Sequence, residues 1–598
     1  MNWNANCKKT GVFFRKHIDI LICTIIVAVI FFLTAAVFEI LLISPDDAAY
    51  QNIMSGTTMG VPDAHCYFLR YPLAAFLTFL YKLDNRVAWY QLFLLSSLAW
   101  CFFLIFSRAC MLCHIRKILY YITSVFAVLL LFMTHLIHVE WTITSGILGM
   151  TAIFRYMTMP SEMPRRSKIR EYGSCIFLLL FSLCIRHTVA FMLFPLMGIC
   201  WLRKVQKLRM STAVDAPPER CTQIRDQVMF LILCLLTTGT VMLIHTHAYA
   251  SEEWQAYKEY TKDRSVLFDY YGYPDFDTYA DVYEKAGITR EACDLMRADY
   301  NYVIPCDNFK SINLKTIANL SGEIYRKDFI KNMMKLLQET LFDLKYLVLN
   351  SLILLLFFCN CSVCSKREKI FFIGAVILWA VVLAGYLAYK GRLPERVMKC
   401  IYYGILGVLS GNLFDSIGLS AKEHSAVARI LNIMCCIFLI SMIGVEFPAL
   451  YRENCENAAL ARSKIQLLQY CKEHPQNEYF RDFGSFSQRG ELVMRRGYDA
   501  ANCLGIGGWT YNSPIFQKSL ESRGIEDIYA AIHENQNIYY LVSQERADKV
   551  IKRLNAYFIS EGKAIRMRMG DKFQTESETV IVLKFKSPFD IGDVQHER

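Results

Sequence analysis

The sequence predicts an α-helical polytopic membrane protein with about eleven spans, sizeable outer loops and a small α/β domain at its C-terminal end. The first observation is composition: 54% of the 598 residues are hydrophobic and only 20% are charged, which is little charge for a soluble protein. The second is a series of long apolar runs up to residue 447, and the third is a change to strand-like alternation beyond it. This composition excludes a disordered chain. The net charge of +11 is interpreted by membrane side, not as a footprint for nucleic acid.

The first span is expected in the apolar run 18–43, which follows a basic N-terminal segment. A membrane helix needs about 20 mostly apolar residues. The run is longer than the apolar core of a signal peptide, and no small-residue cleavage site follows it. We therefore expect a retained anchor whose N-terminus lies in the cytoplasm.

The run 173–201 is divided by Arg186 and His187, and basic residues flank both of its ends. Cytoplasmic loops collect Lys and Arg, so both flanks are expected inside, and two helices must meet at Arg186 near the outer side. This places the C-terminal end outside the cytoplasmic (cell) membrane. The remaining spans are expected at 87–107, 118–136, 141–157, 227–249, 341–359, 370–389, 398–417 and 429–447.

Two domains are predicted, a membrane domain over 1–447 with outer loops 44–86 and 250–340, and an extracytoplasmic domain over 448–598. In the second domain, alternating apolar residues predict strands at its 537–543 and 579–585 segments, and helical spacing predicts a helix between them. That helix should bury Ala547, Val550, Ile551, Leu554 and Phe558 on one face. A further helix is expected at 323–337. The outer cysteines can pair in an oxidising exterior; they are Cys66, Cys293, Cys306, Cys455, Cys471 and Cys503.

Two adjacent carboxylates, Asp46 and Asp47, follow the first span directly. Like charges so close raise each other's pKa unless a cation or a donor compensates them. Such a pair can hold a divalent cation, Mg or Mn, through oxygen ligands. It can also remove a proton from an attacking hydroxyl. The alternative is a solvated helix start in which Asp46 caps a helix over 48–55.

The same loop carries three more ionisable groups, Asp63, His65 and Arg70. The apolar stretch 73–83 that follows is too short to span and is expected to lie along the interface. A lone His is more often structural than catalytic, but this concentration of titratable groups beside a membrane favours a supporting role in a site.

Arg186 lies inside an apolar hairpin, where a charge is costly and usually functional. The planar fork of Arg suits the oxygens of a phosphate. The alternative is a structural ion pair with an acidic residue of a neighbouring helix, such as Glu140.

The short outer loop 389–397 is rich in charge and contains Arg392, Glu395 and Arg396. Basic residues outside run against the positive-inside bias, and a phosphate or pyrophosphate at the outer surface would explain them. The alternative is a salt-bridged loop in which Glu395 satisfies Arg392 or Arg396. Aromatic residues at 262–274, and Trp509 with Asn512, can stack on sugars or simply pack their loops.

With these residues identified, the chain resembles the GT-C superfamily of membrane glycosyltransferases. The matching elements are Pro45-Asp46-Asp47 after the first span and the helix-like 73–83 stretch. The chain is also similar to large membrane proteins of anaerobic Gram-positive bacteria that share Pro-Asp-x-His, Asp-Tyr-x-Gly and Gly-Arg-x-x-Glu-Arg, found here at 62–65, 269–272 and 391–396. It has no extended match to oligosaccharyltransferases, protein mannosyltransferases or lipid A aminoarabinose transferases, which leaves donor and acceptor open.

The resemblance implies an inverting transfer of a sugar from a polyprenyl-phosphate donor to a glycan, lipid or protein acceptor at the outer face of the membrane. It implies that Asp46 or Asp47 activates the acceptor, directly or through a metal, because the superfamily contains both kinds of enzyme. Arg186, Arg392 and Arg396 would stabilise the departing lipid phosphate. The rival interpretations are a transporter or flippase of a lipid-linked saccharide and a non-catalytic envelope assembly protein.

Overall fold

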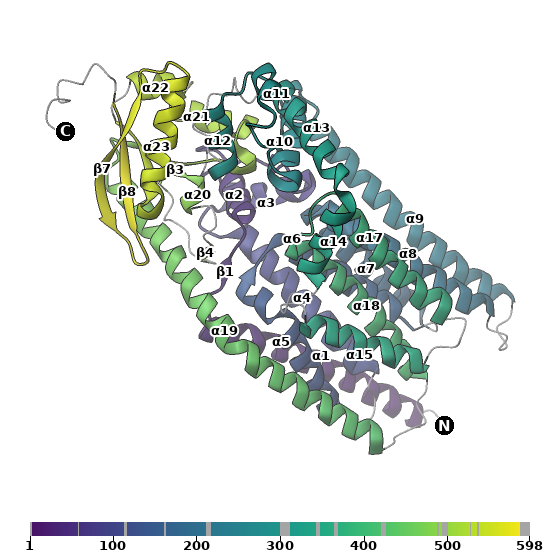
Figure 1. Cartoon of the computed structure of the whole chain (residues 1–598). Coiled ribbons are helices and arrows are strands. Elements are labelled where there is room, and N and C mark those ends of the chain that lie inside the picture. Colours follow the sequence, from purple (N-terminus) through teal and green to yellow (C-terminus); the bar gives the residue numbers. More distant parts are fainter. Residues whose placement is uncertain are drawn as a thin grey trace.

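Helices form most of the chain, and they gather into a bundle that carries an α/β domain at one end (Figure 1). The computed structural model describes residues 3–57, 59–112, 117–160, 163–210, 217–299, 311–341, 347–363, 369–419, 426–486, 490–492, 500–526, 528–534 and 537–586.

A helix lies at each of the eleven predicted spans. These helices are α1 (Trp3–Val37), α4 (Trp89–Leu112), α5 (Lys117–Ile137), α6 (Trp141–Met157), α7 (Arg165–Ile185), α8 (His187–Met210), α9 (Pro217–Ala248), α15 (Leu347–Val363), α17 (Gly374–Tyr389, preceded by a π-helical turn at Lys369–Ile373), α18 (Glu395–Leu419) and α19 (Ala426–Glu473). Within the described residues, six helices are long and apolar enough to cross a membrane, namely α1, α4, α8, α9, α17 and α18. The other five crossings and the orientation of the bundle stay predictions.

The predicted break at Arg186 is present. Helix α7 ends at Ile185 and α8 begins at His187, while Arg186 itself is extended with φ −147° and ψ 95°. The charge pattern of the flanks therefore located a real interruption inside one continuous apolar run.

Helix α6 is the centre of the bundle, since every one of its residues is buried. Glycines let α18 approach it closely: a Cβ on Gly146 would lie 2.6 Å from Cys400 Sγ, and one on Gly411 would lie 2.7 Å from Met157 Cβ. This tight contact fixes the start of α18 against the start of α6.

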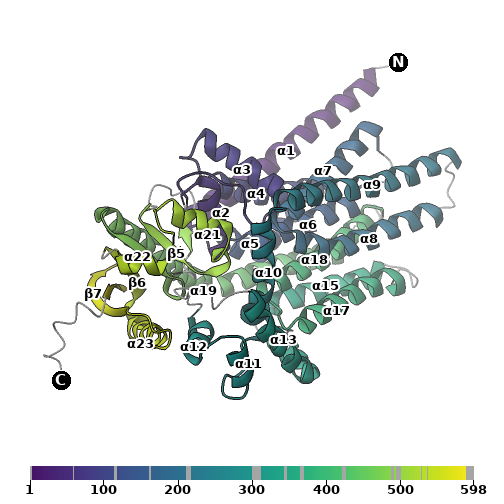
Figure 2. The same ribbon diagram turned by 90° about the horizontal axis from the view of Figure 1, so that it is seen from above.

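The first loop, the middle loop and the C-terminal domain gather at one end of the bundle, opposite the N-terminus (Figures 1 and 2). The first loop holds α2 (Pro45–Ser55) and α3 (Tyr71–Leu83). The helix expected at 323–337 is divided into two helices on either side of Asp328. The middle loop holds α10 (Glu252–Ser265), a π-helical segment (Val266–Tyr271), α11 (Ala280–Lys285), α12 (Arg290–Asp299), α13 (Ser311–Lys327) and α14 (Phe329–Leu341).

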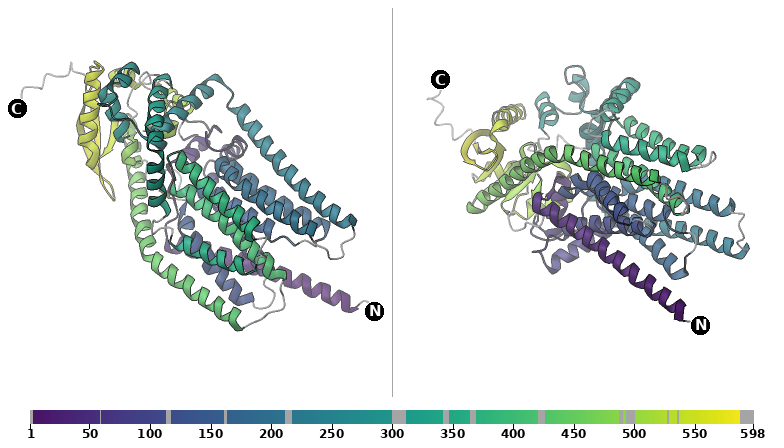
Figure 3. Two further views of the ribbon diagram at one scale, coloured as in Figure 1. Left: turned by 45° about the vertical axis from the view of Figure 1, so that its right-hand side comes forward. Right: turned by 90° about the horizontal axis from the view of Figure 1, so that it is seen from below.

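Helix α19 connects the bundle to the C-terminal domain as one helix of 48 residues (Figure 3). At about 1.5 Å per residue it is about 72 Å long. It continues through Pro448, so the boundary predicted between residues 447 and 448 falls inside a helix.

The C-terminal domain contains a five-stranded mixed sheet of order β5-β3-β6-β8-β7. Strand β3 is parallel to β5 and β6, whereas β8 is antiparallel to β6 and β7. The predicted strands are β6 and β8, and the predicted helix is α23, which buries all its expected apolar residues except the half-buried Ile551. The elements are β3 (Glu478–Asp482), α20 (Phe483–Phe486), β5 (Cys503–Ile506), a 3₁₀ turn (Gly508–Thr510), α21 (Pro514–Glu521), α22 (Ile528–Glu534), β6 (Ile538–Ser543), α23 (Gln544–Ser560), β7 (Arg566–Gln574) and β8 (Thr579–Lys586).

Candidate active site

A small second sheet brings three distant segments of the chain together. It consists of β1 (Leu41–Leu42), β2 (His138–Val139) and β4 (Glu491–Leu492), in the order β2-β1-β4. Strands β1 and β2 are parallel, and each is followed within three residues by a helix, α2 and α6. The first turns of these two helices therefore lie side by side.

The first turn of α2 carries Asp46 and Asp47. Ser44 is the N-cap: its side chain accepts a hydrogen bond from the backbone N–H of Asp46, and Pro45 occupies the first helical position. The prediction that Asp46 itself caps a helix over 48–55 is therefore wrong about the cap. The helix starts earlier, which leaves both carboxylates free for other partners and places them where the helix dipole favours negative charge.

Asp47 is fully buried. It accepts a hydrogen bond from the Tyr90 hydroxyl at 2.5 Å and one from the backbone N–H of Trp141 at 3.4 Å. Burial, and next the nearby carboxylate of Glu140, raise the pKa of Asp47 well above its usual range. Asp47 is thus a structural contact between α2, α4 and α6 that is easily protonated.

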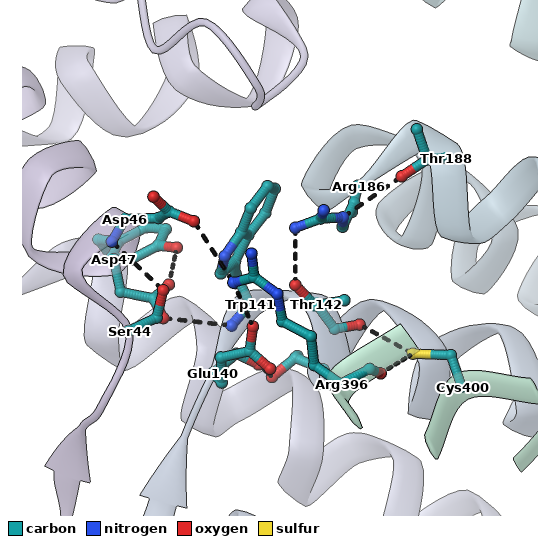
Figure 4. Close-up of polar contacts among 12 residues, drawn as sticks. Ser44, Asp46, Asp47, Glu140, Trp141, Thr142, Arg186, Thr188, Arg396 and Cys400 are labelled. Carbon is teal, nitrogen blue, oxygen red and sulfur yellow. Dashed lines mark hydrogen bonds and ion pairs between the residues drawn. The ribbon is translucent and has the colours of Figure 1, made fainter. Parts of the chain in front are cut away.

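Asp46 faces the opposite charge of Arg396, which projects from the first turn of α18 (Figure 4). Arg396 Nη1 lies 3.5 Å from Asp46 Oδ2 and 3.3 Å from Glu140 Oε1. The Asp46 and Arg396 side chains keep 18% and 29% exposure, against 5% for Glu140. The accessible carboxylate of the site is therefore Asp46. The buried Glu140 forms a second ion pair with the same Arg396 guanidinium.

Arg186 reaches the same place from the break between α7 and α8 (Figure 4). It donates to the hydroxyls of Thr142 at 2.8 Å and Thr188 at 3.3 Å, and its guanidinium stacks 4.2 Å from the centre of the Trp141 ring. The pair with Glu140 that the sequence suggested is made by Arg396 instead. The hydrogen bonds of Arg186 go to neutral hydroxyls, while the carboxylates of Glu140 and Asp46 attract its charge electrostatically.

Tyr50, one helical turn after Asp46, adds a polar group to the site. Its hydroxyl is buried, and no hydrogen-bond partner for it exists among the described residues. It interacts electrostatically with Asp46 and Arg186. Its ring packs against Trp141 and Trp509 at 5.2 and 5.6 Å between centroids.

A cavity of about 770 Å³ opens beside these residues. Its wall includes Ser44 and Pro45 from the start of α2, and Glu140. Arg396 and Lys399 contribute two cations from one turn of α18. Leu130 and Leu131 of α5 are apolar residues of the wall, and α19 contributes Glu446, Ala449, Leu450 and Glu453. Glu140 and Glu395 pair with the two cations, Arg396 and Lys399. The apolar residues of α5 offer contacts to a lipid chain, and the cations are the groups of this cavity that can meet an anion.

The other predicted site residues lie in separate contacts. Arg392 forms an ion pair with Asp269 at 2.7 Å, and Glu395 forms one with Lys399 at 2.7 Å. Neither contact joins the carboxylates of α2, although Glu395 borders the same cavity.

Asp63 and His65 form a pair whose atoms Oδ1 and Nδ1 lie 2.6 Å apart, and Lys518 of α21 contacts the second Asp63 oxygen at 3.0 Å. Burial alone would raise the pKa of Asp63, but the hydrogen bonds from His65 and Lys518 outweigh it and hold that pKa well below its usual range. His65 stacks on Trp254, with centroids 5.5 Å apart. This pair fastens the first loop to the middle loop and to the C-terminal domain.

Arg70 occupies the N-cap position of α3, where its side chain makes no capping hydrogen bond, and it is 5% exposed. It donates to His187 Nδ1 at 2.7 Å, and burial lowers its pKa to about 10. Because His187 follows Arg186 directly, this hydrogen bond from Arg70 stabilises the break between α7 and α8.

Trp509 is 7% exposed and its ring contacts Tyr50 and Phe68, while its carbonyl accepts a hydrogen bond from Tyr257. Trp509 therefore packs the C-terminal domain against the site, as expected if it has a packing role and does not stack on a sugar.

Sequence reasoning missed four contributors, namely Tyr50, Tyr90, Trp141 and Lys399, and treated Glu140 only as a partner of Arg186. One signal was present for Glu140, since an acidic residue directly precedes the apolar run 141–157. Nothing local distinguishes the two tyrosines from other aromatic residues of a membrane protein.

The donor set does not fit a divalent cation as it stands. Asp46 faces Arg396, and Asp47 is engaged by Tyr90 and Trp141. Within the part of the chain that the structure describes, no group of three or more His, Cys, Asp and Glu side chains is placed to hold a metal ion, whereas Mg²⁺ takes near-octahedral oxygen ligands. The Mg or Mn expected from the carboxylate pair stays a prediction.

No protein-family model matches the sequence, and neither does any curated protein. Among solved structures, the chain is similar to the crystal structures of ArnT from Cupriavidus metallidurans in the apo state, with a TM-score of 0.40, and bound to undecaprenyl phosphate, with a TM-score of 0.37. Both matches have 10% sequence identity and cover 94% of this chain and 97% of ArnT.

Proposed function

We propose that this protein is a membrane glycosyltransferase that moves a sugar from a polyprenyl-phosphate donor to an acceptor at the outer face of the cytoplasmic membrane. The observation that carries the proposal is the juxtaposition of Asp46 with Arg396 and Arg186 (Figure 4), together with the 770 Å³ cavity that Arg396 lines. A general base and phosphate-binding cations are the groups that this reaction needs.

Asp46 is the proposed base, because it is accessible while Asp47 is buried. It removes the proton of the acceptor hydroxyl as the oxygen attacks the anomeric carbon of the sugar. The bond from that carbon to the phosphate oxygen breaks, and its electron pair leaves with the lipid phosphate. Attack opposite the leaving group inverts the anomeric centre.

Arg396 and Arg186 stabilise the negative charge that grows on the phosphate, which is where fixed charges accelerate a reaction most. Lys399 lies one turn after Arg396 on the same cavity wall. Because a lipid phosphate leaves as a stable anion, no strong acid is needed. Arg392, which pairs with Asp269, would act on the donor only if that ion pair opened.

Asp47 and Glu140 position the reacting groups. Asp47 fixes the first turn of α2 against α4 and α6, and Glu140 aims Arg396 at Asp46. Tyr50, which is fully buried, packs against Trp141 beside Asp46 and supports the site from within the fold. Asp63, His65 and Arg70 keep the surrounding loops in place.

The test uses membranes that contain the protein and a panel of radiolabelled polyprenyl-phosphate sugars. We expect Asp46→Asn to lower transfer by about 100- to 10,000-fold, the range for loss of a general base. The matched control is Asp84→Asn, which removes an exposed carboxylate of the same loop. Equal transfer by wild type and Asp46→Asn would remove Asp46 from the mechanism. Movement of intact labelled donor between leaflets without transfer would favour a flippase.

A further inference from the structure

A second cavity of about 160 Å³ lies between the C-terminal domain and helix α2. Residues at the carboxyl ends of the parallel strands β3 and β5 line one side of it, including Arg481, Asp482 and Gly507. Pro45, Ala48, Ala49 and Asn52 of α2 line the other side. The carboxyl edge of parallel strands is where α/β domains bind ligands.

Arg481 is the distinctive residue of this cavity. Its guanidinium lies over Gly505, where a Cβ would be 3.3 Å from Nη2. Among the described residues, no hydrogen bond or ion pair of its side chain is found, and its Nε is shielded from solvent. Because Arg481 is partly buried and unpaired among these residues, its guanidinium can make charge-assisted hydrogen bonds with an anion that enters the cavity.

The other charged groups around the cavity already have partners. Lys464 pairs with Glu491 at 2.6 Å, Arg523 with Glu478 at 2.8 Å, and Asp482 with Arg546 at 3.1 Å. The opposite charges of each pair offset one another, so Arg481, unpaired within the part of the chain that the structure describes, gives the cavity a net positive charge.

Asn52 approaches from the opposite wall. No hydrogen bond of its side-chain amide is found within the described residues, and it lies on the face of α2 away from Asp47 and Tyr50. An amide and a guanidinium on two sides of a small cavity supply several N–H donors to one group of oxygens.

We propose that this cavity binds an oxyanion, the phosphate or carboxylate group of a small hydroxylated molecule, between Arg481 and Asn52. Arg481 donates two hydrogen bonds to two oxygens of the group, and Asn52 donates one. Pro45 lines both this cavity and the larger one. The anion would therefore contact α2, the helix that carries Asp46, on the face that packs against the C-terminal domain. Binding here does not depend on the transfer reaction.

The test is calorimetric titration of the purified full chain in detergent with inorganic phosphate and, separately, with glucuronate, at constant ionic strength. We expect saturable binding of at least one of them, a Kd at least tenfold higher in Arg481→Gln, and a rise of a few fold in Asn52→Ala. Arg568→Gln, an exposed arginine of the same domain, should stay within twofold of wild type. Asp46→Asn should bind like wild type even where transfer is lost, which separates this site from the proposed function.

Absence of saturable binding for both anions, or an unchanged Kd in Arg481→Gln, would overturn the proposal. If Arg481→Gln does not fold, Ala49→Leu decides, because it fills the cavity and leaves every charge in place. Binding that survives this filling would place the anion elsewhere. Phosphate and glucuronate affinities together show which oxyanion the cavity prefers.

Discussion

The ion pairs of Arg396 allow the sharpest test of the site. Replacing this residue by Gln removes the cation that lies 3.5 Å from Asp46 and 3.3 Å from Glu140. At an effective dielectric constant of about 20, each of these contacts amounts to about 5 kcal/mol of attraction. The 29% exposure of Arg396 screens part of it, and desolvation offsets much of the remainder. A net coupling of about 0.5–3 kcal/mol per pair remains, the range for residues in contact.

The loss of catalysis should exceed this coupling, because Arg396 also meets the growing charge of the phosphate. Removing one preorganised donor of this kind costs about 100- to 1,000-fold in kcat. We expect that range for Arg396→Gln, with the acidic limb of the kcat/KM profile moved to higher pH. Lys390→Gln, which removes an exposed cation from the same loop, should stay within a few fold of wild type.

The double variant Arg396→Gln/Glu140→Gln separates two roles of Arg396. If Arg396 only balances the buried Glu140, removing both charges should restore stability and activity together. If it acts on the phosphate, thermal stability should recover while kcat stays low. The assay is initial-rate transfer from a labelled donor beside thermal unfolding of the same preparations, and recovered kcat in the double variant would refute the catalytic role.

Four further outcomes are expected. The raised pKa of Asp47 means that its ionised form opposes folding above its unfolded pKa of about 4, so Asp47→Asn should raise Tm at pH 7 more than at pH 4. The lowered pKa of Asp63 has the opposite sign: Asp63→Asn should lower Tm at pH 7, and the difference should shrink as pH falls below about 4. Transfer should keep at least half its rate in EDTA, since side-chain cations meet the phosphate; loss restored by Mn²⁺ would assign the Asp pair to a metal. The buried thiols of Cys471 and Cys503 lie close enough to interact, so on an oxidising face a non-reduced digest should contain their two peptides joined by a disulfide.

Much of the fold could be predicted because its signals are local. Each of these signals occupies a short window of sequence: the apolar runs of about 20 residues, their basic flanks and the interruption at Arg186. A helix lies at each expected run. The strand-helix-strand pattern that contains β6, α23 and β8 depended on equally local alternation.

The site was predictable only in part, because its assembly depends on contacts between distant segments. Asp46, Arg186 and Arg396 could be chosen one by one from charge beside apolar sequence. Their partners could not: the register of β1 on β2 sets Asp47 against Trp141, and two-residue strands leave no periodicity to read. Arg392 has the same local signal as Arg396, and only the fold directs it to Asp269.

The order of the small sheet has a consequence for how this protein matures. Its middle strand, β1, precedes Asp46 by a few residues, yet one of its neighbours is β4 at Glu491–Leu492. The carboxylates thus emerge from the ribosome long before the strand that completes their support. The first loop therefore lacks the support of β4 until the last part of the chain has been synthesised and folded. A chain shortened before residue 491 should reach the membrane and still never acquire a formed site.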